Sequence, residues 1–212
     1  MPASLEKPIP SKKPKQLEPD TFTLDENGRT RWKRNEEIAA KLKQLGDFLI
    51  IGGYEESHAA RYAKLAYTLA RYPLSVVELH NDGRLSAIEG IGDTIAGIVG
   101  ELLETGTCRK WEGWARHTPV SVLELTFIPG LGAKTIRTLY QEHGIDSLDA
   151  LEAALVGHRL SRVKGLGAKT LEAIHQTLDS RSPSHAPRTR RESNAPRPKA
   201  RQAAVEELVL VF

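Results

Sequence analysis

The spacing of hydrophobic residues predicts a chain built mainly of short helices. Apolar side chains three or four residues apart predict a first helix that has Asn35 as its cap and ends at Gly52-Gly53. A second helix is predicted from about Glu56 to Arg71, where Pro73 stops it. The apolar face of the first helix consists of Ile38, Leu42, Leu45 and Leu49.

A short hydrophobic phrase occurs three times and organises the rest of the chain. Its copies are Leu85-x-x-Ile88-x-Gly90-Ile91-Gly92, Leu125-x-x-Ile128-x-Gly130-Leu131-Gly132 and Leu160-x-x-Val163-x-Gly165-Leu166-Gly167. Apolar residues return four and seven positions after the second glycine, so a helix is predicted to begin at each copy. Glycines permit a tight turn with positive φ, while the aliphatic residue between them can pack on the core. The phrase therefore predicts a repeated unit of helix, hairpin and helix.

Further capping signals complete an all-α prediction. Thr118 with Pro119 predicts the start of a helix before the second hairpin, and Asp146 is the expected cap of a helix before the third. Alternating residues around Asp25-Glu26-Asn27-Gly28 predict a small β-hairpin over residues 21–34. These signals divide the helical part into residues 35–117, with the first hairpin, and residues 118–179, with the second and third.

The two ends of the chain have a different composition. Residues 1–20 are rich in Pro and Lys and read as a disordered leader, and residues 180–202 read as a basic disordered linker. Seven basic residues and one acid, Glu192, fall within 181–201, whereas residues 21–179 carry 19 basic and 21 acidic side chains. The helical part is thus nearly neutral, and any DNA contact there needs a few well-placed groups.

The hairpins have the chemistry of an anion site. Unbonded N–H groups at a helix start, with the positive end of the helix dipole, can hold a phosphate. The second and third copies both read GLGAKT, which puts Lys134 and Lys169 two residues beyond the glycines. The first copy has Asp93 and Thr94 there, and Asp93 as a helix cap would occupy the N–H groups and repel phosphate. Six glycines complete the predicted phosphate-binding set: Gly90, Gly92, Gly130, Gly132, Gly165 and Gly167.

These motifs resemble helix-hairpin-helix motifs, and residues 35–178 resemble the amino-terminal DNA-binding region of family X DNA polymerases. The resemblance rests on five sequence segments: NEEIAAKLKQLGDFL from Asn35, AYTLARYP from Ala66, LSAIEGIGDTIAGIVGELLETG from Leu85, LELTFIPGLGAKTIRTLYQEHGIDSLDALEAA from Leu123 and RLSRVKGLGAKTLEAI from Arg159. The resemblance covers about two thirds of the chain. It implies tandem hairpins that bind DNA phosphates without reading bases.

The resemblance also bears on catalysis. Polymerases of this family hold two Mg²⁺ ions with a carboxylate trio on a palm domain; no Asp-x-Asp pair for such a trio occurs here, and polymerase activity is not expected. The family's 5′-deoxyribose-phosphate lyase uses a lysine that falls at Ile98, and a phosphate-contacting lysine falls at Thr94. Residues at or near the family's 5′-phosphate pocket remain: His58, Tyr62, Lys64 and Lys110. A lyase using Lys64 or Lys110 instead therefore stays open.

Family resemblance further implies a K⁺ or Na⁺ ion in such hairpins, bound by backbone carbonyls. At the second hairpin these would belong to Thr126, Ile128 and Leu131, and at the third to Ser161, Val163 and Leu166. No other cofactor is expected. A single cysteine, Cys108, excludes an internal disulfide and a cysteine-based zinc site.

The last ten residues, AAVEELVLVF, are apolar after the basic linker. One interpretation is a short element that folds back on the body. The other is a docking peptide, since Glu207-Leu208-x-Leu210-x-Phe212 is similar to the motif with which bacterial repair proteins bind the sliding clamp, with Glu207 in place of the usual Gln. Leu208, Leu210 and Phe212 would then contact the clamp or a repair polymerase or nuclease.

Three functional hypotheses follow from the sequence. The favoured one is a non-catalytic DNA-binding protein that recognises gapped, nicked or branched DNA during repair. The second is a lyase acting on abasic or 5′-deoxyribose-phosphate ends, and the third is a protein-interaction adaptor. The chain has no signal run and no apolar stretch long enough for a membrane span, which indicates a cytoplasmic, nucleoid-associated protein.

Overall fold

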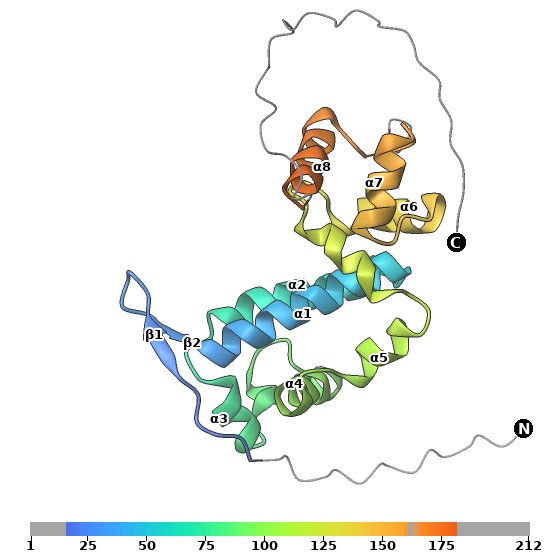
Figure 1. The fold of residues 1–212 in the computed structure, drawn as a ribbon. Coiled ribbons are helices and arrows are strands. Elements are labelled where there is room, and N and C mark those ends of the chain that lie inside the picture. Colours follow the sequence, from blue (N-terminus) through green and yellow to red (C-terminus); the bar gives the residue numbers. More distant parts are fainter. Residues whose placement is uncertain (1–15, 161–162, 164, 182–212) are drawn as a thin grey trace, which may run out of the picture.

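The computed structural model describes residues 16–160, 163 and 165–181 of the chain, and within them the fold is helical apart from one small β-hairpin (Figure 1). The leader, the basic linker and the residues Leu208, Leu210 and Phe212 fall largely or wholly outside this described part. No helix in the described ranges is both long enough and apolar enough to cross a membrane.

The elements follow one another through short connections. They are β1 (Phe22–Leu24), β2 (Thr30–Trp32), α1 (Lys33–Gly52), α2 (Glu56–Ala70), α3 (Val76–Asn81), η1 (Leu85–Ala87), α4 (Asp93–Thr105), α5 (Arg109–Ala115), η2 (Val120–Phe127), α6 (Ala133–His143), α7 (Leu148–Val156) and α8 (Ala168–Arg181). The tandem helix-hairpin-helix fold predicted from the repeats is therefore confirmed.

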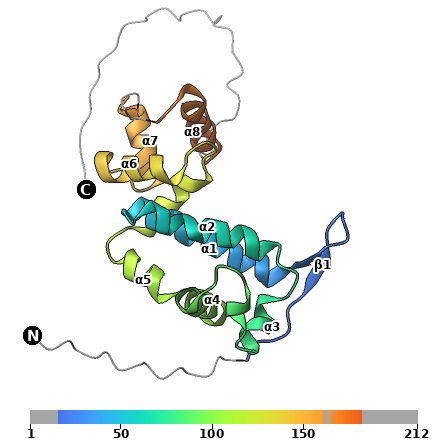
Figure 2. The same cartoon turned by 180° about the vertical axis from the view of Figure 1, so that it is seen from behind.

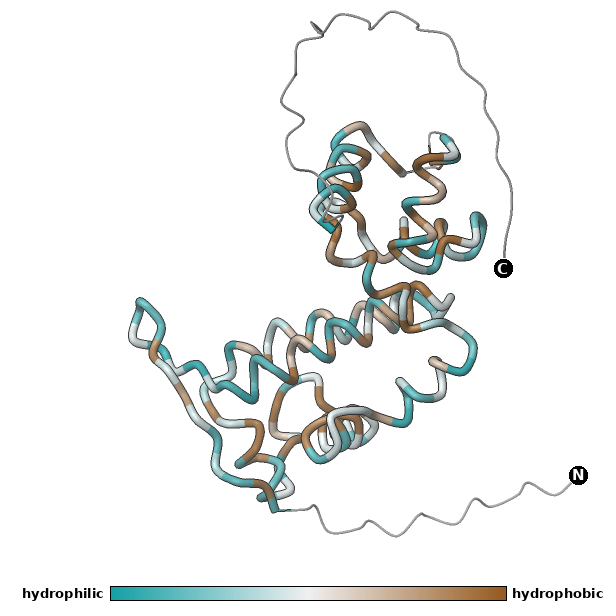
Figure 3. Tube along the Cα trace, viewed as in Figure 1, coloured by the Kyte–Doolittle hydropathy of each residue, from teal (hydrophilic) through white to brown (hydrophobic). Residues whose placement is uncertain are grey.

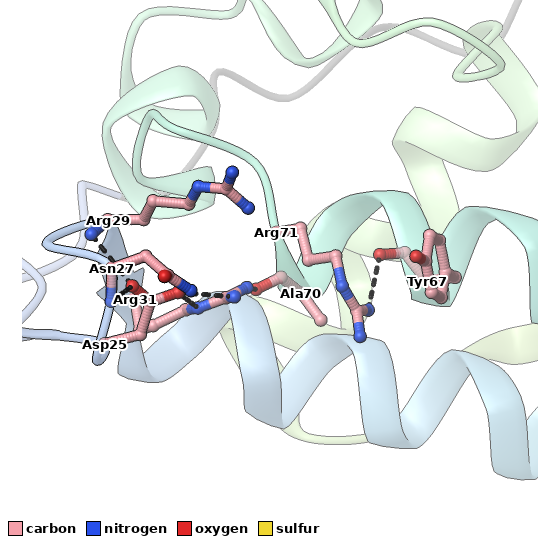
Figure 4. Close-up of polar contacts among 7 residues, drawn as sticks. All are labelled: Asp25, Asn27, Arg29, Arg31, Tyr67, Ala70 and Arg71. Carbon is pink, nitrogen blue, oxygen red and sulfur yellow. Dashed lines mark hydrogen bonds and ion pairs between the residues drawn. The ribbon is translucent and has the colours of Figure 1, made fainter.

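The β-hairpin is present and is attached to the end of α2. Its strands pair antiparallel, with Phe22 opposite Trp32. Asp25 accepts hydrogen bonds from the backbone N–H of Arg29 at 2.9 Å and from the Arg31 guanidinium at 2.7 Å (Figure 4). Arg31 also donates to the Ala70 carbonyl at 3.4 Å, which holds the hairpin against α2.

Two apolar cores share helix α1. Leu42, Leu45 and Leu49 of α1 pack with α2, α3 and α4, while Phe48 and Ile51 pack with η2, α6, α7 and α8. Teal and brown positions are interspersed along α1 and α2, as expected for helices that bury only part of their surface (Figure 3). Helix α1 thus connects the part that carries the first hairpin to the part that carries the other two.

Gly52, at the end of α1, lies against the connection from α5 to η2. A Cβ atom added to Gly52 would lie 2.7 Å from Thr118 Oγ1 and 2.8 Å from the Trp114 ring. Trp114 in turn packs edge-on against Tyr54, and Trp111 stacks on Phe48 with ring centroids 4.8 Å apart. Only a residue without a side chain fits between α1 and the connection from α5 to η2.

Asn35 does not cap α1, which corrects the first capping prediction. Strand β2 runs directly into the helix, so Trp32 is the N-cap and Asn35 is a fully buried residue of the first turn. Its side chain accepts from the N–H of Val76 at 2.8 Å and donates to the carbonyls of Leu74 and Tyr72 at 3.0 and 3.4 Å. Asn35 therefore satisfies buried backbone groups of the turn between α2 and α3.

Three other capping predictions also change. Ser147 replaces Asp146 as the cap of α7, because its hydroxyl accepts from the N–H of Ala150 at 3.2 Å. Asp93 is the first helical residue of α4, and no side chain caps this helix. Thr118 is buried, and the segment after Pro119 is the 3-10 helix η2 rather than an α-helix.

Candidate nucleic-acid interface

The three hairpins share two backbone features among the residues that the structure describes. The first glycine of each has a positive φ, at 88° for Gly90, 80° for Gly130 and 90° for Gly165. A backbone hydrogen bond closes each turn, and its donor is the residue two positions before the following helix. In the second hairpin Leu131 N donates to Ile128 O at 3.1 Å. Ile91 and Leu131, between the glycines, are buried and anchor their hairpins on the two cores.

In the first and second hairpins, the second glycine of the pair does not have the positive φ that the sequence suggested for the glycines of the turn; it caps the helix that follows. Gly92 and Gly132 have φ of −87° and −81° and serve as the N-caps of α4 and α6, without a side-chain hydrogen bond at either cap. Open space surrounds the position where a Cβ would be added at Gly92, Gly132 or Gly167. The first-turn N–H groups of α4 and α6 are therefore not occupied by capping side chains and can meet an anion.

The second and third hairpins pack against each other reciprocally. A Cβ added to Gly130 would lie 3.4 Å from Thr170 Oγ1, and one added to Gly165 would lie 3.5 Å from Thr135 Oγ1. Each glycine turn thus meets the first turn of the other hairpin's helix. The first turns of α6 and α8 therefore lie close together, in the part of the structure that also holds α7 (Figures 1 and 2).

The lysines of these hairpins differ in their surroundings. Lys134 forms an ion pair with Glu56 in the first turn of α2, and Arg137 Nη1 lies 4.0 Å from the same carboxylate. Lys169 is exposed and forms no ion pair with any residue that the structure describes. Glu56 therefore stands next to Lys134 where an external anion would have to bind.

The predicted 5′-phosphate residues fall into two groups. Lys110 Nζ lies 3.4 Å from Tyr54 Oη and 5.7 Å from the Tyr62 ring centroid. His58 also lies near Tyr54, with ring centroids 6.1 Å apart, and its Nδ1 is 3.2 Å from Glu55 Oε2. Tyr62 is 5% exposed, and burial raises the pKa of its phenol.

Lys64 lies on a different face of α2. It lines a hollow next to the first hairpin together with Arg61 and Gly90, whereas Tyr62 faces the core. The structure thus brings Tyr62 and Lys110 together and separates Lys64 from them.

The positions of the missing family lysines lie beside Lys110. Thr94 and Ile98, from α4, line a cavity of about 280 Å³ that Arg109 and Lys110 of α5 also line. Ile98 is buried, at 6% exposed. Lys110 thus lines the same cavity as the two positions at which the family resemblance predicted lysines.

The second hairpin retains carbonyls for a monovalent ion. The Ile128 carbonyl accepts one hydrogen bond, from Leu131, and so keeps a second lone pair. Thr126 lies in η2 and Leu131 in the turn that follows it, so the three carbonyls come from adjacent segments of the chain. Ser161 of the third hairpin falls outside the described residues. No group of three His, Cys, Asp or Glu side chains among the described residues could hold a metal.

Two exposed aromatic residues were not singled out by the sequence. Phe127 is 76% exposed and lies three residues before Gly130; the other repeats have Ala87 and Arg162 at this offset. Tyr67 is 65% exposed on α2. Phe127 could have been found by aligning the three repeats, because only the second has an aromatic residue at this offset. Nothing in the helical pattern of α2 distinguishes Tyr67 from the other exposed residues.

Comparison with known proteins supports this fold and its chemistry. A family described as "SAM-like Helix-hairpin-helix tandem" matches residues 122–180, and one described as "Helix-hairpin-helix domain" matches residues 33–108. The chain thus contains tandem helix-hairpin-helix domains, which support DNA binding of the helix-hairpin-helix type.

The chain is also similar to the "DNA polymerase/3'-5' exonuclease PolX" of Bacillus subtilis (strain 168). They are 24% identical over 142 residues, which is 67% of this chain and 24% of the relative. The similarity thus spans about a quarter of the relative's length. It confirms the resemblance to the helix-hairpin-helix region of a family X polymerase.

Proposed function

We propose that the chain is a non-catalytic DNA-binding protein of DNA repair, which holds backbone phosphates of gapped, nicked or branched DNA. The reciprocal packing of the second and third hairpins supports this proposal most strongly, because it brings together the first turns of α6 and α8, which carry Lys134 and Lys169. Such groups meet phosphates rather than base edges, so binding is sensitive to DNA shape and indifferent to sequence. The first hairpin contributes more weakly, since Asp93 adds negative charge there.

A binding panel tests the proposal directly. Intact, nicked, gapped and branched DNA of equal length are compared by fluorescence anisotropy, each in two unrelated sequences. The interrupted or branched forms should bind more tightly than the intact duplex, and the two sequences should give the same order. Equal affinity for all shapes would remove the repair assignment, and absence of binding would favour a protein-interaction adaptor.

Glu56→Gln should raise the affinity for duplex DNA by about two- to five-fold. The change removes a carboxylate that competes with phosphate for Lys134 and Arg137. Anisotropy titrations of the variant and the wild type measure the effect. Glu37→Gln is the matched control, because Glu37 pairs with Arg34 on α1 and should leave the affinity unchanged. A lower affinity for Glu56→Gln would mean that this pair supports DNA binding instead of opposing it.

Lyase activity is the second candidate, and the position of Lys110 favours it over other enzymatic possibilities. A Schiff base needs a deprotonated amine beside the sugar, and Ile98 cannot provide one. We expect no borohydride-trapped adduct between this protein and DNA with a 5′-deoxyribose-phosphate end. A trapped adduct that disappears in Lys110→Ala but persists in Lys64→Ala would replace the non-catalytic assignment with a lyase.

Two further features belong to the same proposal. A K⁺ or Na⁺ ion at the carbonyls of Thr126, Ile128 and Leu131 would bridge the second hairpin to a phosphate. The segment with Leu208, Leu210 and Phe212 would bind the sliding clamp or another repair enzyme, and DNA binding would place the protein at the nucleoid.

A further inference from the structure

A second positively charged surface lies on α2, apart from the second and third hairpins. Arg61, Lys64, Tyr67 and Arg71 recur at intervals of three or four residues and are all exposed. They therefore share one side of the helix, opposite the buried side that packs on α1. We call these four residues the α2 stripe. At 1.5 Å per residue it is about 15 Å long, the length of about four stacked nucleotides at 3.4 Å each.

The cations of the α2 stripe are available to an external ligand. Among the residues that the structure describes, no carboxylate forms an ion pair with Arg61, Lys64 or Arg71. Lys134, by contrast, is paired with Glu56. The stripe thus combines three uncompensated charges with one aromatic ring.

Tyr67 is arranged as a stacking platform. The Arg71 guanidinium carbon lies 3.8 Å from the centre of the Tyr67 ring, and Arg71 also donates to the Tyr67 carbonyl at 3.3 Å (Figure 4). The residue four positions before Tyr67, on the preceding turn of α2, is the small Ala63, and Tyr67 is 65% exposed. A ring fixed by a cation and otherwise open is suited to stack on a nucleic acid base.

The other end of the stripe meets the first hairpin. Arg61, Lys64 and Thr68 line a hollow of about 360 Å³ together with Glu89 and Gly90. Glu89 is the one carboxylate in this lining, against two cations. A phosphate in the hollow would therefore lie next to Arg61 and Lys64, with the backbone turn of the first hairpin beside it.

We infer that the α2 stripe binds a single strand of DNA, with phosphates on Arg61 and Lys64 and a base stacked on Tyr67. A duplex keeps its bases stacked on one another and offers Tyr67 no base face, so the ligand is an unpaired strand. The inference rests on the proposed function: the second and third hairpins hold the duplex, and the stripe receives the strand that leaves it at a gap or branch.

Matched variants of the full chain test the inference. The ligands are a labelled oligothymidine of about twelve nucleotides, within the site sizes of single-strand binders, and a blunt duplex, both at about 0.15 M salt. Tyr67→Ala should weaken oligothymidine binding at least about five-fold, the lower limit for loss of one base stack, and leave duplex binding unchanged. Tyr67→Phe keeps the ring and should bind like the wild type.

Two results would overturn the inference. One is that Tyr67→Ala leaves oligothymidine affinity unchanged, which would mean that the exposed ring serves a protein partner or none. The other is an equal loss for oligothymidine and duplex. Failure of the proposed function is distinguishable in the same titrations, because Lys134→Gln with Lys169→Gln would then leave duplex binding unaffected. Circular dichroism checks that each variant is folded, which is expected because Tyr67 is exposed.

Discussion

Neutralising both hairpin lysines, as Lys134→Gln with Lys169→Gln, should weaken duplex binding by about a hundred-fold or more. Each lysine is expected to make one charge-assisted contact to phosphate, worth about 1.5–3 kcal/mol. The slope of log affinity against log salt concentration should fall by about 0.9 for each lost contact. Both quantities come from anisotropy titrations at several salt concentrations, and the loss should be the same for unrelated DNA sequences.

Glutamine is a better test than glutamate at these positions. Glu56 lies beside Lys134, so a glutamate at position 134 would also add repulsion within the protein. Lys43→Gln provides the matched control. Lys43 is an exposed lysine on α1 that pairs with Asp47 at 2.7 Å, far along the chain from either hairpin. It should change the affinity by less than about two-fold. Unchanged affinity and salt slope in the double variant would contradict the phosphate-binding role of the hairpins.

Asn35→Ala should lower the free energy of unfolding by about 3 kcal/mol, because it leaves the buried N–H of Val76 and two carbonyls without their partner. At about 2–4 °C per kcal/mol for a chain of this size, the melting temperature should fall by about 6–12 °C. Thermal unfolding followed by circular dichroism measures the change.

Asn27→Ala is the control for this prediction. Asn27 lies in the exposed turn of the β-hairpin, and the hydrogen bond it makes to Asp25 uses its backbone N–H. Its substitution should change stability by less than about 0.5 kcal/mol. Equal stability of the two variants would show that the turn before α3 contributes little to the fold.

The repeated phrase made most of the helical fold predictable. Most of the apolar residues at fixed offsets from each glycine pair, such as Ile136 and Leu139, proved to be fully buried, because one helical period determines which side faces a core; Ala96 and Leu171 are partly buried. The glycines predicted the turns for a local reason as well, since a positive φ at Gly90, Gly130 and Gly165 favours a residue without a side chain.

Helix caps were less predictable because chemically equivalent residues lie next to each other. Asp146 and Ser147 can both accept from an N–H, and which of them does so depends on the backbone conformation at the turn. At Asn35, the extension of β2 into α1 moved the helix start and freed the amide for a different partner. Such outcomes are decided by tertiary packing rather than by residue type.

The sequence indicated candidate site residues but not how they lie relative to one another in space. Lys134 and Glu56 are far apart in the chain, so their ion pair follows from the packing of α6 near the start of α2. Lys64 and Lys110 were grouped by family resemblance, whereas the structure places Lys64 next to the first hairpin and Lys110 next to Tyr54. The α2 stripe was not predicted from the sequence, because the helical pattern is defined by the apolar residues of α2 and not by the exposed residues between them.

The most direct test of the account is a double-mutant cycle between a hairpin lysine and a DNA phosphate. Single phosphates of a gapped duplex are replaced by neutral methylphosphonates, and each DNA is titrated with the wild type, Lys134→Gln and Lys169→Gln. For each lysine we expect one phosphate whose neutralisation weakens binding by the wild type but not by the variant in which that lysine is changed to Gln. If the losses simply add at every phosphate, the lysines do not hold the backbone and the account is wrong.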